Sequence, residues 1–112
     1  MRLLFVENHK VFARTVASCF LGAHHVTFAS SLTEAEHALE VGTFDAVLVD
    51  YDLDDGKGSE LVRALRARGF PLPIVAISAK DEGNAELMRA GADVTCSKLK
   101  FATINEVLAR FG

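Results

Sequence analysis

Short apolar runs alternate with amphipathic stretches along the whole chain. The first run ends at Val6 and is continuous, which suits a strand that is covered on both faces. Similar runs recur four more times, and Pro71 and Pro73 bracket the entry to one of them. The pattern therefore predicts five strands, at residues 2–6, 25–29, 44–49, 74–77 and 93–97.

The segments between these strands carry apolar residues at the spacing of a helix. Gly22, Gly42 and Gly91 are placed to end three of these helices, and the pattern from Ser31 to Glu34 is typical of a capping box at a helix start. The residues expected to face inward are Val11, Ala13, Val16, Ala17 and Phe20; Ala35, Ala38, Leu39 and Val41; Leu61, Val62 and Leu65; and Ile104, Val107, Leu108 and Phe111.

Five strand–helix units of this kind predict a parallel sheet with helices on both of its faces. We expect an acidic loop at 52–58, a more polar helix at 81–90 and a last helix at 101–111. No linker, repeat or low-complexity segment interrupts the pattern, so residues 1–112 are expected to form one domain. The last helix stops near the end of the chain, which leaves open that this domain is cut from something longer.

Composition narrows the classes of function. The chain has 112 residues, half of them hydrophobic, and a formal charge of −3, so it has a sizeable core and no basic footprint for nucleic acid. No apolar run is long enough to span a bilayer, and the first residues predict a strand and not a signal peptide. Cys19 and Cys96 have no paired spacing, so we expect two buried, reduced thiols and a cytoplasmic location.

Polar residues with matching chemistry follow the predicted strands. In an open parallel sheet, functional groups gather at the carboxyl ends of the strands. A carboxylate that attacks a phosphoryl group needs a cation, a hydroxyl and an ammonium to hold the charged oxygens. Oxygen ligands from two strand ends suit Mg²⁺. The residues at these ends are Glu7 and Asn8, Asp50 and Asp52, Ser78, and Lys98.

Taken together in this order, these motifs resemble a response-regulator receiver domain over essentially all 112 residues. The matching segments are Leu4-Phe5-Val6-Glu7-Asn8-His9, Asp45-Ala-Val-Leu-Val-Asp50, Leu53-Asp54-Asp55-Gly56-Lys57-Gly58, Pro73-Ile-Val-Ala-Ile-Ser78-Ala79-Lys80, Ala90-Gly91-Ala92 and Ser97-Lys98. The resemblance implies a flavodoxin-like, doubly wound (βα)5 α/β fold with strand order 2-1-3-4-5. It also implies a phosphorelay or two-component function and not primarily an enzyme.

The resemblance further assigns residues and partners. It implies that Asp50 accepts the phosphoryl group, with Ser78 as the phosphate-binding hydroxyl and Lys98 as the phosphate-binding lysine. Mg²⁺ would be held by the ligands Glu7, Asn8, Asp50 and the backbone carbonyl of Asp52. The implied partners are a histidine kinase or phosphotransfer protein and a downstream effector, with no membrane and no nucleic acid bound directly. Weak pairing of two copies through the fourth and fifth strand–helix units is a further family expectation.

Three residues depart from the family pattern. Asn8 stands where the family usually has a second acid, and the missing charge should weaken Mg²⁺ binding by roughly 1–3 kcal/mol. Leu99 replaces the usual proline after the lysine, so we expect a trans bond, since a cis bond without proline costs about 2.5–4 kcal/mol. Thr95 replaces the usual aromatic residue or histidine that changes rotamer on activation, and its side chain is too short to swing in that way.

Alternatives remain open. Asp50, Glu7, Asn8 and Ser78 could act only as caps of turns or helices, and Lys98 could be a surface lysine. A degenerate receiver would keep the fold and serve as a phosphorylation-independent protein-interaction module.

Two other functional classes share features with this chain. A haloacid-dehalogenase-like phosphatase resembles it at Asp50-Tyr51-Asp52, Ile77-Ser78 and Lys98, but only Glu106 follows the lysine where an acidic pair is expected. A flavodoxin-like cofactor binder is disfavoured because Glu7 would repel a phosphate.

Overall fold

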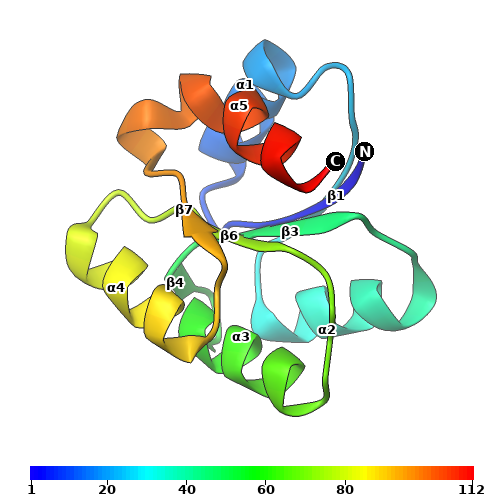
Figure 1. Cartoon of the computed structure of the whole chain (residues 1–112), viewed down its shortest axis with the longest axis vertical. Helices are drawn as coiled ribbons and strands as arrows, with labels where there is room; N and C mark the ends of the chain where they lie inside the picture. Colours follow the sequence, from blue (N-terminus) through cyan, green and yellow to red (C-terminus); the bar gives the residue numbers. More distant parts are fainter.

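A five-stranded parallel sheet forms the middle layer of the computed structural model, which describes residues 1–112 (Figure 1). Its strands are β1 (Arg2–Val6), β2 (His25–Ala29), β3 (Ala46–Val49), β6 (Ile74–Ala76) and β7 (Val94–Thr95), in the order β2-β1-β3-β6-β7. Because β4 and β5 lie outside this sheet, the order is 2-1-3-4-5 among the parallel strands, and the predicted topology is confirmed.

Helices cover both faces of the sheet. The helices are α1 (Lys10–Phe20), α2 (Leu32–Val41), α3 (Gly58–Ala67), α4 (Asp81–Ala90) and α5 (Ile104–Leu108), with 3₁₀ helices η1 (Lys98–Thr103) and η2 (Ala109–Phe111) on either side of α5. Figure 1 shows α1 and α5 on one face and α2, α3 and α4 on the other. None of these helices has the length and apolar character that crossing a membrane would require.

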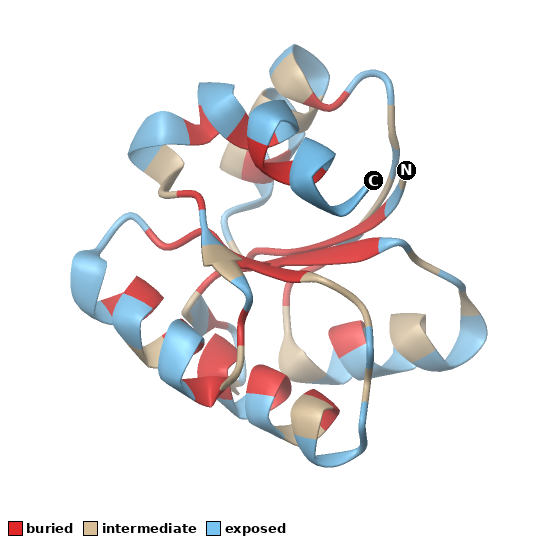
Figure 2. Ribbon diagram, viewed as in Figure 1, coloured by how far each residue is buried: buried red, intermediate tan, exposed pale blue.

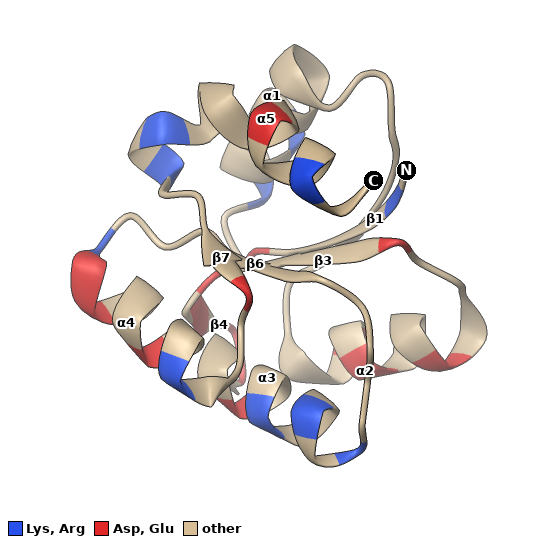
Figure 3. Cartoon of the chain, in the orientation of Figure 1, with Lys and Arg blue, Asp and Glu red and all other residues tan.

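The strand sequences explain this layering, because successive side chains of a strand point to opposite faces. In β1, Leu3 and Phe5 pack in the cluster under α1 and α5, whereas Leu4 and Val6 pack in the cluster under α2, α3 and α4. All four side chains are fully buried, and Figure 2 shows the sheet as the most buried layer. Figure 3 shows the charged residues on the helices and at strand ends.

Several residues predicted to face inward do not. Val11 is 82% exposed, because it lies two residues, or about 200°, around α1 from the buried Ala13. Val41 is the last residue of α2 and is 72% exposed, and Phe111 lies in η2, outside the buried stripe of α5. Cys19 on α1 is also exposed, so its predicted burial is wrong, while Cys96 is buried as predicted.

The ends of the helices follow the sequence signals with small shifts. Ser31 Oγ accepts a hydrogen bond from Glu34 N at 3.0 Å, as in a capping box. The Glu34 carboxylate, however, accepts from Ser30 N at 2.7 Å and not from Ser31 N. Gly42 and Gly91 end α2 and α4 as predicted. Of the last predicted helix, at 101–111, only Ile104–Leu108 is α-helical, because its two ends belong to the 3₁₀ helices η1 and η2.

The segment predicted as an acidic loop contains a short antiparallel hairpin, β4 (Asp52–Leu53) with β5 (Gly56–Lys57). This hairpin returns the chain to the end of β3, where Gly58 N donates to Tyr51 O at 2.5 Å. A Cβ on Gly58 would lie 1.9 Å from the carbonyl oxygen of Asp50. Only glycine therefore lets α3 begin this close to the end of β3.

We predict that Gly58→Ala lowers the free energy of unfolding by roughly 3 kcal/mol or more, because the methyl group meets backbone that cannot yield cheaply. Gly22→Ala is the matched control, since nothing lies within 4 Å of its added Cβ, and it should be neutral or stabilise by up to about 1 kcal/mol. Thermal and urea unfolding measure both changes. Equal stability of the two variants would contradict the close approach of α3 to β3.

Candidate functional site

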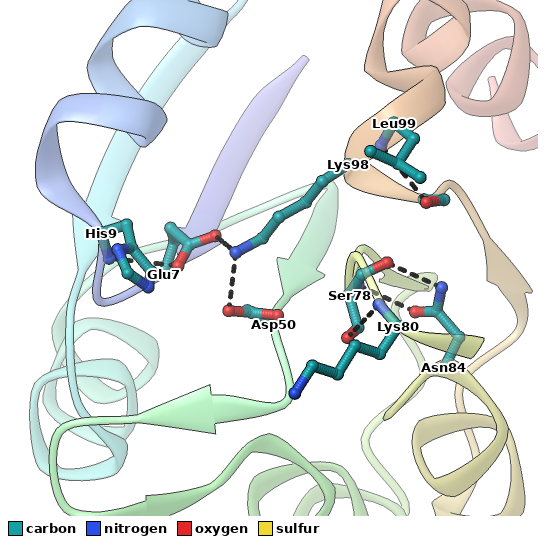
Figure 4. Close-up of polar contacts among 9 residues, drawn as sticks. Glu7, His9, Asp50, Ser78, Lys80, Asn84, Lys98 and Leu99 are labelled. Carbon is teal, nitrogen blue, oxygen red and sulfur yellow. Dashed lines mark hydrogen bonds and ion pairs between the residues drawn. The ribbon is translucent and has the colours of Figure 1, made fainter. Parts of the chain in front are cut away.

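The carboxyl ends of β1 and β3 bring two acidic residues side by side. Glu7 follows β1, and its N–H donates to Ala29 O at 2.9 Å. Asp50 follows β3, and its N–H donates to Val6 O at 2.9 Å. These bonds continue the parallel ladders one residue past each strand, so the sheet itself fixes where both carboxylates begin. Figure 4 shows the carboxylates of Glu7 and Asp50 directed toward the same side chain, that of Lys98.

Lys98 joins these two carboxylates. Its Nζ lies 2.6 Å from Glu7 Oε1 and 2.9 Å from Asp50 Oδ2 (Figure 4). Glu7 and Asp50 are only 3% and 5% exposed, and Lys98 reaches them from the start of η1. With two negative charges and one positive charge, the cluster carries a formal charge of −1. It can therefore accept a further cation.

The pKa values of Glu7 and Lys98 are both raised, but for different reasons. Burial raises the pKa of Glu7 and the nearby Asp50 adds to the effect, while the bonds from Lys98 and from His9 N offset it only in part. Burial opposes the charged form of Lys98, but its bonds to Glu7 and Asp50 outweigh this and raise the pKa of Lys98. Lys98 thus stays charged at neutral pH, but its single positive charge does not fully offset the two negative charges of Glu7 and Asp50.

Oxygen atoms at this site lack partners. Asn8 Oδ1 is buried and accepts no hydrogen bond, and Glu7 Oε1 has only the ion pair to Lys98. A buried polar atom without a partner is unusual and costs free energy unless a ligand satisfies it. Amide and carboxylate oxygens are the donors that Mg²⁺ prefers, so these residues fit such an ion. No three His, Cys, Asp or Glu side chains converge anywhere, so backbone and amide oxygens would have to complete the shell.

The side chain of Asp52 pairs with a lysine other than Lys98. It forms an ion pair with Lys57, whose hydrogen bond lowers the pKa of Asp52, and both side chains are largely exposed. Lys57 also lies over the ring of Tyr51, at 5.1 Å from its centroid. The sequence did not suggest the pair of Asp52 with Lys57. Because this pair occupies the side chain of Asp52, the residue's expected contribution to the metal site is its backbone carbonyl.

Ser78 lies at the end of β6 and is buried, but its hydroxyl does not bond to Asp50. Ser78 Oγ instead accepts from Lys80 N at 3.2 Å. The backbone of Ser78 is held by Asn84, whose side-chain amide accepts from Ser78 N and donates to Ser78 O (Figure 4). Sequence reasoning missed Asn84, because one polar residue in a polar helix gives no signal of burial.

The other two departures lie on the surface. Leu99 is exposed, and the chain contains no cis peptide bond, so the predicted trans bond after Lys98 is confirmed. Thr95 ends β7 and is exposed as well. The structure thus brings together Glu7, Asp50 and Lys98, places Asn8 and Ser78 beside them, and has no aromatic side chain at position 95.

Glu7→Gln should stabilise the fold at neutral pH. Because the folded pKa of Glu7 lies above its ordinary value of 4.5, its contribution to stability is fully present below about pH 4.5 and is lost as pH rises through the folded pKa. Lys98 keeps Asp50 as its partner in this variant. We expect a gain on the order of 1 kcal/mol at pH 7, or roughly 4–8 °C in Tm, which disappears below pH 4.5.

Thermal unfolding across this pH range measures the effect. Glu36→Gln is the control, because Glu36 is exposed on α2 and forms no ion pair, and it should leave the stability nearly unchanged. A Glu7→Gln variant that is less stable than the wild type at pH 7 would contradict this account, because it would show that Lys98 fully offsets the cost of burying the Glu7 carboxylate.

Comparison with known proteins points to one family. The sequence model of the response regulator receiver domain matches residues 3–109. The chain is similar to the transcriptional regulatory protein PhoP of Escherichia coli K12, with 32% identity over 113 residues that cover 98% of this chain and 50% of PhoP. It is also similar to the swarming motility regulation protein RssB of Serratia marcescens, with 30% identity over 72% of this chain and 37% of RssB. The chain thus spans about half or less of these relatives.

Solved structures show the same fold. The receiver domain of the sensor histidine kinase PA1611 from Pseudomonas aeruginosa, which has magnesium in its active-site cleft, superposes with a TM-score of 0.87. Its identity is 27%, over 98% of this chain and 95% of that one. The chemotaxis response regulator CheY4 of Vibrio cholerae gives a TM-score of 0.85 at 22% identity, over 99% and 98% of the two chains. At that identity, the likeness to CheY4 shows the fold alone.

Proposed function

The chain belongs to the response regulator receiver domain family of two-component signalling, and on this premise we propose that Asp50 accepts a phosphoryl group with the help of Mg²⁺. The observation that carries the proposal is the Lys98 ammonium, held between Glu7 and Asp50 at buried strand ends. Receiver domains are generally signalling domains and not enzymes. Family membership does not favour the haloacid-dehalogenase-like phosphatase that the motifs also resemble.

The transfer step assigns a task to each residue. An oxygen of Asp50 forms a bond to phosphorus while the bond from phosphorus to the donor histidine nitrogen breaks, and the electron pair leaves with the imidazole. Lys98 stays charged and stabilises the negative oxygens of the transferred group. Ser78 donates its hydroxyl proton in a hydrogen bond to another of these oxygens. Neither residue gives up its proton, so both act by electrostatic stabilisation.

Glu7, Asn8, Asp50 and the backbone carbonyl of Asp52 would hold the Mg²⁺ ion. When bound, the ion neutralises charge that builds up on the phosphoryl oxygens. Asn8 contributes an oxygen but no charge, and its Oδ1 is the unpartnered atom of the site. The weaker attraction of this ligand set is the reason to expect reduced Mg²⁺ affinity.

Upstream, the donor is a histidine kinase or a phosphotransfer protein, and downstream, the phosphorylated domain acts on an effector protein or domain in the cytoplasm. A phosphorylation-independent interaction module is the competing function. It rests on Asn8, Thr95 and Leu99, which depart from the family pattern at the metal site, at the switch position and after the lysine, but the match to the receiver family does not favour it.

The proposed function is tested by incubating the domain with a small phosphodonor such as acetyl phosphate in the presence of Mg²⁺, followed by intact-mass measurement. We expect the mass of one phosphoryl group on the wild type and none on Asp50→Asn, because the amide cannot act as the nucleophile. Treatment with hydroxylamine should remove it, as expected of an acyl phosphate. Asp54→Asn is the control, since Asp54 is exposed in the same acidic loop and should leave labelling intact.

Labelling of Asn8→Asp alone would favour the interaction module instead. If both the wild type and Asn8→Asp are folded and neither gains the mass of a phosphoryl group, the proposed function is contradicted.

Asn8→Asp should tighten Mg²⁺ binding by roughly 5- to 150-fold, because it restores a charge at the metal site that is worth about 1–3 kcal/mol. Asn8→Ala should weaken binding below the wild-type level, since it removes the oxygen as well. The fluorescence of Tyr51 can report both, as it is the only tyrosine, the chain has no tryptophan, and it adjoins Asp50. Equal affinity of all three proteins would mean that residue 8 does not ligate the ion.

A further inference from the structure

Asn84 is a buried amide whose two polar atoms both bind the backbone of one residue. Its Oδ1 accepts from Ser78 N at 2.8 Å, and its Nδ2 donates to Ser78 O at 2.9 Å. The side-chain amide thus makes the two hydrogen bonds to Ser78 that a neighbouring strand would make with its backbone, although Asn84 lies in the first half of α4. Both bonds are shielded from solvent, where an unpaired peptide group would be costly.

The position of the pair follows from where the sheet ends. The ladder between β6 and β7 stops after Ala76 pairs with Thr95 and Cys96 N donates to Ala76 O at 2.7 Å. The chain then turns into η1 at Lys98, so β7 provides no further partner for Ser78. Asn84 supplies both of the bonds that a longer strand would have made.

The same helix end surrounds the Ser78 hydroxyl. Ser78 Oγ accepts from Lys80 N, and a Cβ on Gly83 would lie only 2.5 Å from this oxygen. The helix thus packs tightly behind the hydroxyl through a glycine and holds its backbone through Asn84. The hydroxyl proton has no acceptor in the structure, so it is free to be donated toward the Asp50 side of the site.

We propose that Asn84 is a positioning residue that orients the Ser78 hydroxyl for the phosphoryl group and ties α4 to it. This inference rests on the proposed function of Asp50. Without the amide, the Ser78 peptide would lose both partners, and its hydroxyl would no longer be held at one place. A shift of Ser78 toward a phosphoryl oxygen would also carry the first turn of α4 with it. This coupling between Ser78 and α4 matters because the short side chain of Thr95 cannot change rotamer in response to phosphorylation, as the residue at its position usually does in the family.

The test uses beryllofluoride with Mg²⁺ as a phosphoryl mimic, and compares the wild type with two variants. Asn84→Ala removes both bonds to Ser78. Asn84→Asp is nearly isosteric, but its ionised carboxylate places an oxygen against the Ser78 carbonyl and cannot donate to it. We expect mimic binding to weaken by about 5- to 30-fold in both variants, as for a displaced hydrogen bond to a charged group. Binding of Mg²⁺ alone, which does not use Ser78, should stay unchanged.

A double-mutant cycle separates positioning from general damage. Ser78→Ala should itself weaken mimic binding, and adding Asn84→Asp to it should cause little further loss, because Asn84 acts through the Ser78 hydroxyl. Asn105→Ala is the matched control. Asn105 Nδ2 also donates to a backbone carbonyl, that of Phe20, but far from the site, so its loss should affect only stability.

Each outcome has one meaning. Mimic affinity of Asn84→Asp equal to that of the wild type, or full additivity with Ser78→Ala, would overturn the role of Asn84 and leave the proposed function standing. Failure of the wild type to bind the mimic in the presence of Mg²⁺ would overturn the proposed function and, with it, any positioning role. Weaker mimic binding in both Asn84 variants, together with little further loss when Asn84→Asp is added to Ser78→Ala, would establish the inference.

Discussion

One partly buried ammonium shared by two buried carboxylates is the interaction around which this site is built. Lys98 Nζ contacts Glu7 at 2.6 Å and Asp50 at 2.9 Å, and neither carboxylate could be buried without compensation. Burial and, to a smaller extent, the charge of Asp50 raise the pKa of Glu7, because the single positive charge of Lys98 offsets them only in part. The same excess of negative charge suits the site to a cation, which the proposed phosphoryl transfer to Asp50 would require. Under that proposed function, stability and function oppose one another at these three residues.

The rest of the fold serves to bring these groups together. The ladders β2-β1 and β1-β3 continue one residue past their strands and fix Glu7 and Asp50 side by side. Gly58 lets α3 begin against the carbonyl of Asp50, and Asn84 holds Ser78 where β7 has already turned away. Backbone hydrogen bonds thus position the two acids, whereas the close contact at Gly58 positions α3 and the side-chain amide of Asn84 positions Ser78.

Much of this architecture could be predicted from the sequence, because it depends on local patterns. Alternating apolar runs and helical stripes predicted the sheet, its order and both covered faces, and the rule that chemistry gathers at strand ends selected Glu7, Asp50 and Lys98. The exposure of Val11 and the 3₁₀ ends of the last helix depend on where elements begin and how they wind, which periodicity does not resolve. The clamp of Asn84 on Ser78 is a tertiary contact, and no local signal distinguishes it from an exposed helix residue.

The crystal structure of the domain with Mg²⁺ and beryllofluoride would test the central claim most directly. We predict beryllium on a carboxylate oxygen of Asp50, with Lys98 Nζ within about 3 Å of one fluoride and the Ser78 hydroxyl near another. Glu7 and Asn8 should face the metal, with Lys98 no longer bonded to the carboxylate of Asp50. A structure in which beryllofluoride is absent from Asp50, or in which Lys98 keeps both of its carboxylates and ignores the ligand, would contradict this account.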